Sequence, residues 1–251
     1  MTLTSRYTKL VPALVAGLAA TAMLVLPAHA QEISLALPEE GALTSRIVQL
    51  VLLVAVLSLA PSILIMVTSF VRIAVVLSLL RTAMGVQQAP PNSVLISLAL
   101  FLTAFVMAPV LQDSYRDGVA PYLADEISTE EAWDLSSGPF KDFMLSQVRE
   151  EDLKLFIDLS DTAAPETPQA TPIHVLIPAF MISELRRAFE IGFLLFIPFI
   201  VIDLVVASVL MSMGMMMLPP IMISLPFKLI FFVLVDGWRL VAGSLVQSFG
   251  A

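Results

Sequence analysis

Cysteine is absent from the 251-residue chain, and only two histidines occur. Without cysteine there can be no disulfide, no thiolate metal site and no thiol nucleophile. If an amino-terminal signal containing His29 is removed, His174 is the one histidine left. A single histidine argues against a histidine zinc site and against a Ser-His-Asp triad. Walker-type, GxSxG and HExxH motifs are also missing, so we expect no enzyme, no cofactor and no metal.

Charged residues are scarce as well. They make up 14% of the chain, against about 25% in ordinary globular proteins, while 58% of the residues are hydrophobic. Solvation by a lipid bilayer is the simplest way to accommodate such a composition. The net charge of −8 is unevenly spread, because residues 112–172 hold fourteen acidic and four basic side chains. The negative charge therefore belongs to one extramembrane segment, which we call the acidic segment.

The amino terminus resembles a secretory signal. A short basic region with Arg6 and Lys9 precedes an apolar stretch, and Ala28 and Ala30 form an A-x-A site after Pro27. The alternative is an uncleaved first membrane helix, but the helix-breaking proline and the small residues favour cleavage. We expect a signal peptide over residues 1–30 and a short mature segment over residues 31–45.

Apolar stretches in the rest of the chain predict an all-α membrane protein built from two helical hairpins. In the first hairpin, residues 46–111, we expect a span over about 47–68 that continues as helix to Leu80, with Pro61 as a kink. A second apolar stretch follows the Pro90-Pro91 break. The second hairpin, residues 173–251, is interrupted by Pro219-Pro220. With the mature amino terminus outside, four crossings would place residues 82–93 and the 212–220 turn inside and the acidic segment outside.

The acidic segment contains one amphipathic pattern. Apolar side chains recur among charges and predict at least one helix that packs against a partner. These are Phe140, Phe143, Met144, Val148, Leu155 and Phe156. Residues 161–172, rich in Ala, Thr and Pro, are typical of a linker.

Several charges lie within or beside apolar stretches, where they are costly unless paired or hydrated. On a helix, Arg187 would share a face with Glu184 and with Glu190 and could pair with either. Ion pairs between helices or between copies of the chain explain such charges, and a proton or ion path is the alternative. The candidate charges are Arg72, Glu184, Arg187, Asp203, Lys228 and Asp236.

Methionine is concentrated in residues 211–220, which we call the methionine loop. Five of the 13 methionines of the chain lie in this loop, beside Gly214 and before Pro219-Pro220. Methionine side chains are long, unbranched and polarisable, so they adapt to irregular partners. The loop is either a deformable apolar seal or ordinary packing at the end of a helix.

Two long segments resemble the FliP family of flagellar type III export proteins. They are residues 178–192 (PAFMISELRRAFEIG) and residues 226–238 (PFKLIFFVLVDGW). Shorter matches are residues 68–73 (TSFVRI), Pro90-Pro91-Asn92, and residues 212–220 (SMGMMMLPP). The resemblance covers the chain from about residue 45 to its end, and the acidic segment contributes no motif to it.

This resemblance implies a subunit of an export gate in the bacterial cytoplasmic membrane, at the flagellar basal body. Copies of the chain, thought to form a pentamer, would assemble with FliQ and FliR into a helical channel for unfolded flagellar proteins. Kinked helical hairpins would wrap this channel and stand partly clear of the bilayer. Glu184 and Arg187 would lie at contacts between subunits. The residues that would form a gasket in the channel are Met213, Met215, Met216 and Met217.

Three other functions are compatible with parts of the sequence. An injectisome homologue of the same gate is the nearest of them, although the signal peptide and the acidic segment resemble the flagellar branch. An ion-coupled transporter could use Arg72, Glu184 and Asp203. A purely architectural protein without an open pore is the third, and replacing the three methionines at residues 215–217 by alanine would separate it from a gate.

Overall fold

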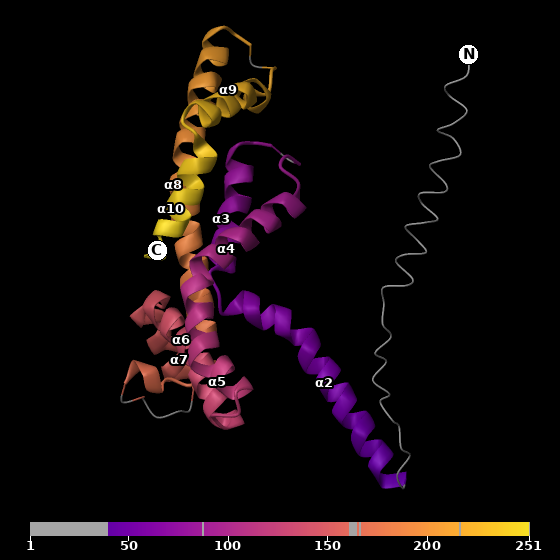
Figure 1. Ribbon diagram of the computed structural model, residues 1–251. Coiled ribbons are helices and arrows are strands. Elements are labelled where there is room, and N and C mark those ends of the chain that lie inside the picture. Colours follow the sequence, from indigo (N-terminus) through magenta and orange to yellow (C-terminus); the bar gives the residue numbers. More distant parts are fainter. Residues whose placement is uncertain (1–39, 87, 161–164, 166, 216, 251) are drawn as a thin grey trace, which may run out of the picture. The chain divides into compact units, whose positions relative to one another are not determined.

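The computed structural model describes residues 40–86, 88–160, 165, 167–215 and 217–250. Every regular element in these residues is a helix, which confirms the expected all-α class (Figure 1). The chain divides into two compact units, and the boundary falls inside helix α2 (Glu40–Met66), between Ala55 and Val56. The expected signal residues Ala28 and Ala30 lie outside the described residues.

The first apolar stretch forms two helices. Helix α2 continues through Pro61, as expected, but it ends at Met66, so the prediction of one helix to Leu80 was wrong. Helix α3 (Phe70–Ala83) begins after a break in which the backbone N–H of Phe70 donates to the hydroxyl of Thr68. Side chains of Ser and Thr compete in this way for backbone groups and interrupt helices. The stretch is too long for one span because it holds a span-length helix and a separate shorter helix.

Helix α4 (Asn92–Ser114) returns beside α3 and begins directly after Pro91. A π-helical turn (Tyr115–Val119) and the short helix α5 (Ala120–Leu123) extend it without a break. Gly118 lies in this turn and lets helix α6 approach closely, because an added Cβ would lie 2.6 Å from the backbone nitrogen of Ser136. The turn therefore connects the first hairpin tightly to the acidic segment.

The acidic segment contains two amphipathic helices, α6 (Thr129–Gln147) and α7 (Glu150–Leu159). The hydroxyl of Ser128 accepts a hydrogen bond from the backbone of Glu131, a capping contact that fixes where α6 begins. Val148 is extended and separates the two helices, which breaks the expected apolar pattern. As a result Leu155 is exposed, while Leu153 packs inward instead.

The second hairpin consists of α8 (Ile173–Ser212), α9 (Pro220–Leu234) and α10 (Gly237–Gln247). Its first helix is far longer than a typical globular helix and contains two prolines. Near its start, α8 packs against α6 and α7, and the turn to α9 lies at the opposite end of α8 (Figure 1). Helix α10 is bent by 63° from α9, where Asp236 adopts a left-handed conformation (φ 53°).

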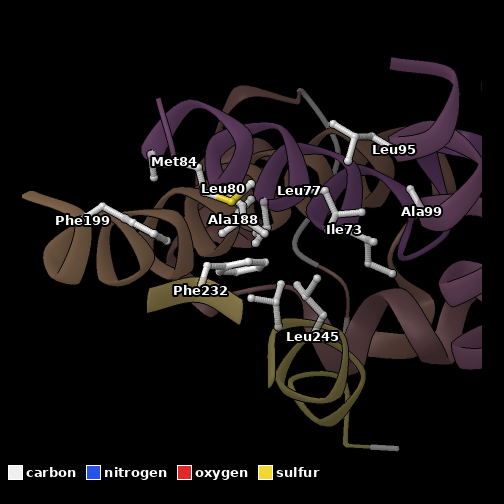
Figure 2. Close-up of a cluster of buried hydrophobic side chains, with 13 residues drawn as sticks. Ile73, Leu77, Leu80, Met84, Leu95, Ala99, Ala188, Phe199, Phe232 and Leu245 are labelled. Carbon is white, nitrogen blue, oxygen red and sulfur yellow. The ribbon is translucent and has the colours of Figure 1, made fainter. Parts of the chain in front are cut away.

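The main core joins both hairpins around α3. Side chains from one face of α3 meet Ala188 and Phe199 of α8, Phe232 of α9 and Leu245 of α10 (Figure 2). Burying a side chain of the size of leucine contributes about 1.5–3 kcal/mol. The fully buried apolar residues of α3 are Ile73, Val76, Leu77 and Leu80, so this helix is the central element of the core.

A second, smaller core attaches the acidic segment to the start of α8. Met144 of α6 packs there with Val67, Leu176 and Phe180. Phe143 of α6 meets Phe180 edge to face, with the ring centroids 6.0 Å apart. The amphipathic helix predicted in the acidic segment thus finds its partner within the same chain.

Among the residues that the structure describes, three helical segments are long and apolar enough to cross a membrane. They are Arg46–Met66, Asn92–Leu123 and Ile173–Ser212, and the bent pair α9–α10 counts as a fourth if it is one span. Apolar side chains on these segments are largely exposed, as expected where lipid or neighbouring subunits replace water.

Candidate functional site

Arg72, in the first turn of α3, is completely buried and lies where four parts of the chain meet. Its Nε donates to Glu184 of α8 at 2.9 Å, and its Nη2 also donates to that carboxylate. Nη2 donates to Gln147 of α6 at 3.0 Å. Nη1 donates to the carbonyl oxygen of Ser248 at 3.0 Å and to its hydroxyl at 3.1 Å. All five N–H donors of the guanidinium are therefore used.

An aromatic side chain completes these surroundings. The guanidinium carbon of Arg72 lies 3.7 Å from the ring centroid of Phe249, a cation–π contact. The ring of Phe249 in turn stacks on Phe143 of α6, with the centroids 6.1 Å apart. We call the set Arg72, Gln147, Glu184, Ser248 and Phe249 the Arg72 cluster. A buried charge costs several kcal/mol unless it is paired and hydrogen-bonded, and here both conditions are met.

Further hydrogen bonds attach the acidic segment beside this cluster. Gln147 accepts a second hydrogen bond, from Arg187 at 3.3 Å. The hydroxyl of Ser183 accepts from the backbone N–H of Arg149 at 3.1 Å and donates to Asp152 at 2.7 Å. The junction of α6 and α7 is thus held to α8 by polar contacts as well as by the smaller core.

The helical pairing that the spacing allowed for Arg187 does not form in the described residues. Glu184 pairs with Arg72, 112 residues earlier in the chain, and Arg187 turns to Gln147. Glu190 pairs instead with Arg186, at 3.1 Å, on an exposed part of α8. The spacing of three residues was compatible with a local pair, but burial of Glu184 beside α3 favours the partner that is buried with it.

A second, partly buried ion pair joins α8 to α9. The ammonium of Lys228 lies 2.6 Å from the carboxylate of Asp203, whose other oxygen accepts from Ser224 at 2.5 Å. Lys228 also donates to the backbone carbonyl of Ala83 at 3.3 Å, at the end of α3. A cation is favourable there, because the last carbonyls of a helix carry partial negative charge. Lys228 and its partners therefore connect the second hairpin to the first.

The methionine loop lies at the turn between α8 and α9 and is exposed. Met217 is 98% exposed, Met213 is 65% exposed and Met215 is 40% exposed. Met216 lies outside the described residues. Gly214 has a positive φ of 74°, which favours glycine in this tight turn. Core methionines such as Met107 and Met144 are buried, so the loop methionines are not core residues of this chain.

The last candidate charge, Asp236, occupies the bend between α9 and α10. Its side chain is exposed and lies 3.8 Å from Arg239 in the next turn. Its left-handed backbone is one that Asp tolerates better than most residues. The structure thus gives Asp236 a role in the turn, away from the two ion pairs that join helices.

Sequence reasoning missed Gln147, Ser248 and Phe249, which complete the surroundings of Arg72. Gln147 follows the amphipathic residues of α6, so the helical pattern could have placed it near the core. Nothing in the sequence marks Ser248 as a partner of Arg72, because the two are 176 residues apart. No group of three His, Asp or Glu side chains among the residues that the structure describes could hold a metal ion.

The outer part of the second hairpin presents an apolar surface. A groove of about 460 Å³ between α8 and α9 is lined by aliphatic side chains and Phe227. The exposed pair Arg186–Glu190 lies on α8 close to exposed phenylalanines, among them Phe189 and Phe193. Such a surface requires lipid or protein neighbours around it.

Comparison with known proteins identifies the family of this chain. A sequence model described as the FliP family matches residues 53–245. The Flagellar biosynthetic protein FliP of Caulobacter vibrioides is 66% identical over 94% of this chain and 90% of its own length. The protein of the same name from Bacillus subtilis is 53% identical over 82% of this chain and 93% of its own length. That of Aquifex aeolicus is 51% identical over 84% of this chain and 88% of its own length. By its matched length and by these identities, the chain belongs to the FliP family.

Proposed function

We propose that this chain is a core subunit of the flagellar protein export gate and that its methionine loop seals the conduit. The relatives are named flagellar biosynthetic proteins, and the helices are long enough to cross a membrane. These findings support a place in the bacterial cytoplasmic membrane at the flagellar basal body. The expected signal peptide is the reason to propose that the acidic segment lies on the periplasmic side. The names of the relatives favour the flagellar export apparatus over the injectisome.

One observation carries the proposed seal. A cluster of soft apolar side chains is exposed at the tip of a hairpin whose base is fully packed and paired. Exposure of Met213, Met215 and Met217 costs hydrophobic free energy that a neighbouring surface would recover. Flexible methionines from several copies could close around a narrow axis and still adapt to a passing chain. Met216, which completes the run, belongs to the same proposed gasket.

Assembly with other subunits is part of this proposal. Copies of the chain, in a proposed pentamer, together with FliQ-like and FliR-like partners, would cover the apolar surface of α8 and α9. Arg187 and the exposed pair Arg186–Glu190 are then candidates for contacts between subunits. Arg72 and Glu184 act within the chain, because each is buried against the other. Unfolded flagellar proteins are the proposed cargo, and no catalysis is proposed.

The transporter alternative is less well supported. Asp203 is paired with Lys228 and Ser224, and Glu184 is paired with Arg72, so neither carboxylate stands alone in an apolar environment. A chain of carboxylates along one helix face, as in a proton path, is not seen in the described residues.

The proposed seal is tested in a bacterial strain in which the variant protein replaces the unmodified chain. Met215→Ala and Met217→Ala are combined, and two quantities are measured: uptake of a small polar dye by the cells, and export of flagellin. Shorter side chains leave gaps in a seal, so we expect dye uptake to rise several-fold while the protein level stays unchanged.

Met222→Ala is the matched control. Met222 is a similarly exposed methionine in the first turn of α9, just outside the methionine loop. The proposed seal predicts that this change has little effect on dye uptake. Equal effects of loop and control variants, or no effect of either on uptake and flagellin export, contradict the role of the loop.

A further inference from the structure

One guanidinium holds both ends of the second hairpin. Glu184 lies in the first third of α8, and Ser248 directly follows α10, so the chain between them runs out to the methionine loop and back. Arg72 binds both residues from α3. We propose that Arg72 is a clasp that closes the base of this hairpin and so keeps the methionine loop in position. The proposal rests on the proposed function of the loop as a seal.

The clasp is what ties the end of α10 to the rest of the chain by hydrogen bonds. Within the described residues, every hydrogen bond from the segment 237–250 to another element comes from Arg72. Packing adds Leu245 in the main core and Phe249 against Phe143. The ring of Phe249 lies against the same guanidinium and stacks on Phe143, so polar and apolar contacts converge on one place.

Two supports along α3 determine the direction of the hairpin. Arg72 holds it at the beginning of α3, and the carbonyl of Ala83 holds Lys228 at the end of α3. A rigid element fixed at two points cannot pivot, whereas one fixed at a single point can. From Glu184 to the end of α8 the helix extends about 40 Å, so a tilt of about 5° would move its tip by about 3–4 Å. A displacement of that size is sufficient to open a contact between methionine side chains.

The same clasp connects the loop to the acidic segment. Arg72 donates to Gln147 at the end of α6, and Phe143 of the same helix stacks on Phe249. A shift of α6 would therefore act on the side chain that positions Glu184 and Ser248. The acidic segment and the methionine loop lie at opposite ends of α8 (Figure 1), and the clasp gives them a physical connection.

The test weakens the clasp without removing its charge. Phe249→Ala deletes the ring beside the guanidinium and leaves the ion pair with Glu184 in place. We expect a several-fold rise in dye uptake in cells that carry the full export apparatus, at an unchanged protein level. Phe101→Ala is the matched control, because Phe101 is an exposed phenylalanine of α4 that lies outside the Arg72 cluster and outside the apolar surface of α8 and α9. It should leave uptake unchanged.

A chemical tether provides the converse measurement. Because the chain contains no cysteine, Phe143→Cys and Phe249→Cys can be combined and joined with a short bifunctional maleimide. The untethered double variant should admit dye, and the tether should return uptake toward the unmodified level. Each single-cysteine variant with the same reagent is the control. If the tether forms and uptake stays high, the clasp is refuted.

Arg72→Lys provides a further test. Lysine keeps the charge, but its three donors lack the planar fork needed to bind Glu184 and Ser248 together. We expect dye uptake above that of the unmodified chain, in protein that still assembles.

These outcomes separate the two proposals. If Met215→Ala with Met217→Ala raises uptake while Phe249→Ala and Arg72→Lys do not, the clasp is wrong and the seal stands. If none of these variants changes uptake, the seal and the clasp both fail.

Discussion

The base of the second hairpin, at the Arg72 cluster, and its tip, at the methionine loop, differ in how far their side chains are buried within the chain. At the base, Arg72 and Glu184 are completely buried and every donor of the guanidinium has a partner. At the tip, Met217 is almost completely exposed and has no packing partner in the described residues. The base is therefore complete within one chain, whereas the tip requires a neighbour that one chain does not supply.

Because of this difference, the residues that stabilise the fold lie near the start of α8, and those proposed to act in the seal lie at its end. Removing a partner from the base leaves a charge buried in a region without water, which is costly. Removing a methionine from the tip deletes little buried surface, so stability should hardly change while contacts to neighbours are lost. Substitutions at the two ends should thus change different measurements.

The largest loss of stability is expected for Arg72→Met. The change keeps most of the volume but leaves Glu184 buried without a counter-charge, which costs about 3–5 kcal/mol. Thermal denaturation of the detergent-solubilised protein should show a strongly reduced midpoint. The double variant Arg72→Met with Glu184→Met removes both charges and should recover part of the loss. If Arg72→Met alone denatures like the unmodified protein, the base is not the rigid region described here.

Lys228→Met is expected to cost less, about 1.5–3 kcal/mol, the range for hydrogen bonds to charged groups. Its partner Asp203 is one-third exposed and keeps a hydrogen bond to Ser224, so the remaining charge is less severely stranded. A double-mutant cycle with Asp203→Asn measures the coupling of the pair in the same denaturation assay. A coupling near zero would show that the pair does not stabilise the junction of α8 and α9.

Substitutions of two glycines, Gly118 in a close helix contact and Gly138 in open space, should change stability in opposite directions. Gly118→Ala would place a Cβ 2.9 Å from the Cα of Ser136, and overpacking of this kind costs about 1–3 kcal/mol. Gly138→Ala meets no atom within 4 Å and, in a helix interior, should be neutral or stabilising by up to about 1 kcal/mol. Denaturation of both variants should show shifts of opposite sign. Equal shifts would contradict the close approach of α6 to the π-helical turn.

The smallest effect is expected for the exposed pair on α8. Arg186→Gln should change stability by at most about 0.5 kcal/mol, as is usual for an exposed pair four residues apart on a helix. Its effect should appear instead in assembly, measured as the share of the protein that migrates as an oligomer. Arg116→Gln is the control, since this exposed arginine of the acidic segment also pairs with nearby acidic residues. A large drop in the denaturation midpoint for Arg186→Gln would show that this pair stabilises the fold as the buried charges at the base do.

Much of the helical architecture could be predicted from the sequence. Apolar stretches and double prolines located the hairpins, and the amphipathic pattern located α6, because these signals are local. The break at Thr68 was missed, since a hydroxyl competing for the backbone gives only a weak local signal. Leu155 was assigned to the packed face because Val148 was not recognised as the end of a helix.

The partners of the buried charges could not be predicted from the sequence in the same way. That Arg72, Glu184, Asp203 and Lys228 must be satisfied somehow was evident from their apolar surroundings. Which residues satisfy them was not, because a partner 112 or 176 residues away leaves no trace in local spacing. Local spacing allowed Arg187 to pair with Glu184 or Glu190, but the fold brings it to Gln147 instead.

The sequence by itself determined the class of protein, the order of its hairpins and the family to which it belongs. Composition, apolar runs and motifs are properties of the chain alone, so they are present before any folding. Only the tertiary structure decided that one arginine of α3 connects the acidic segment, α8 and the end of the chain. That connection exists because burial without water forces each charged group to find its partners in space, wherever the fold brings them.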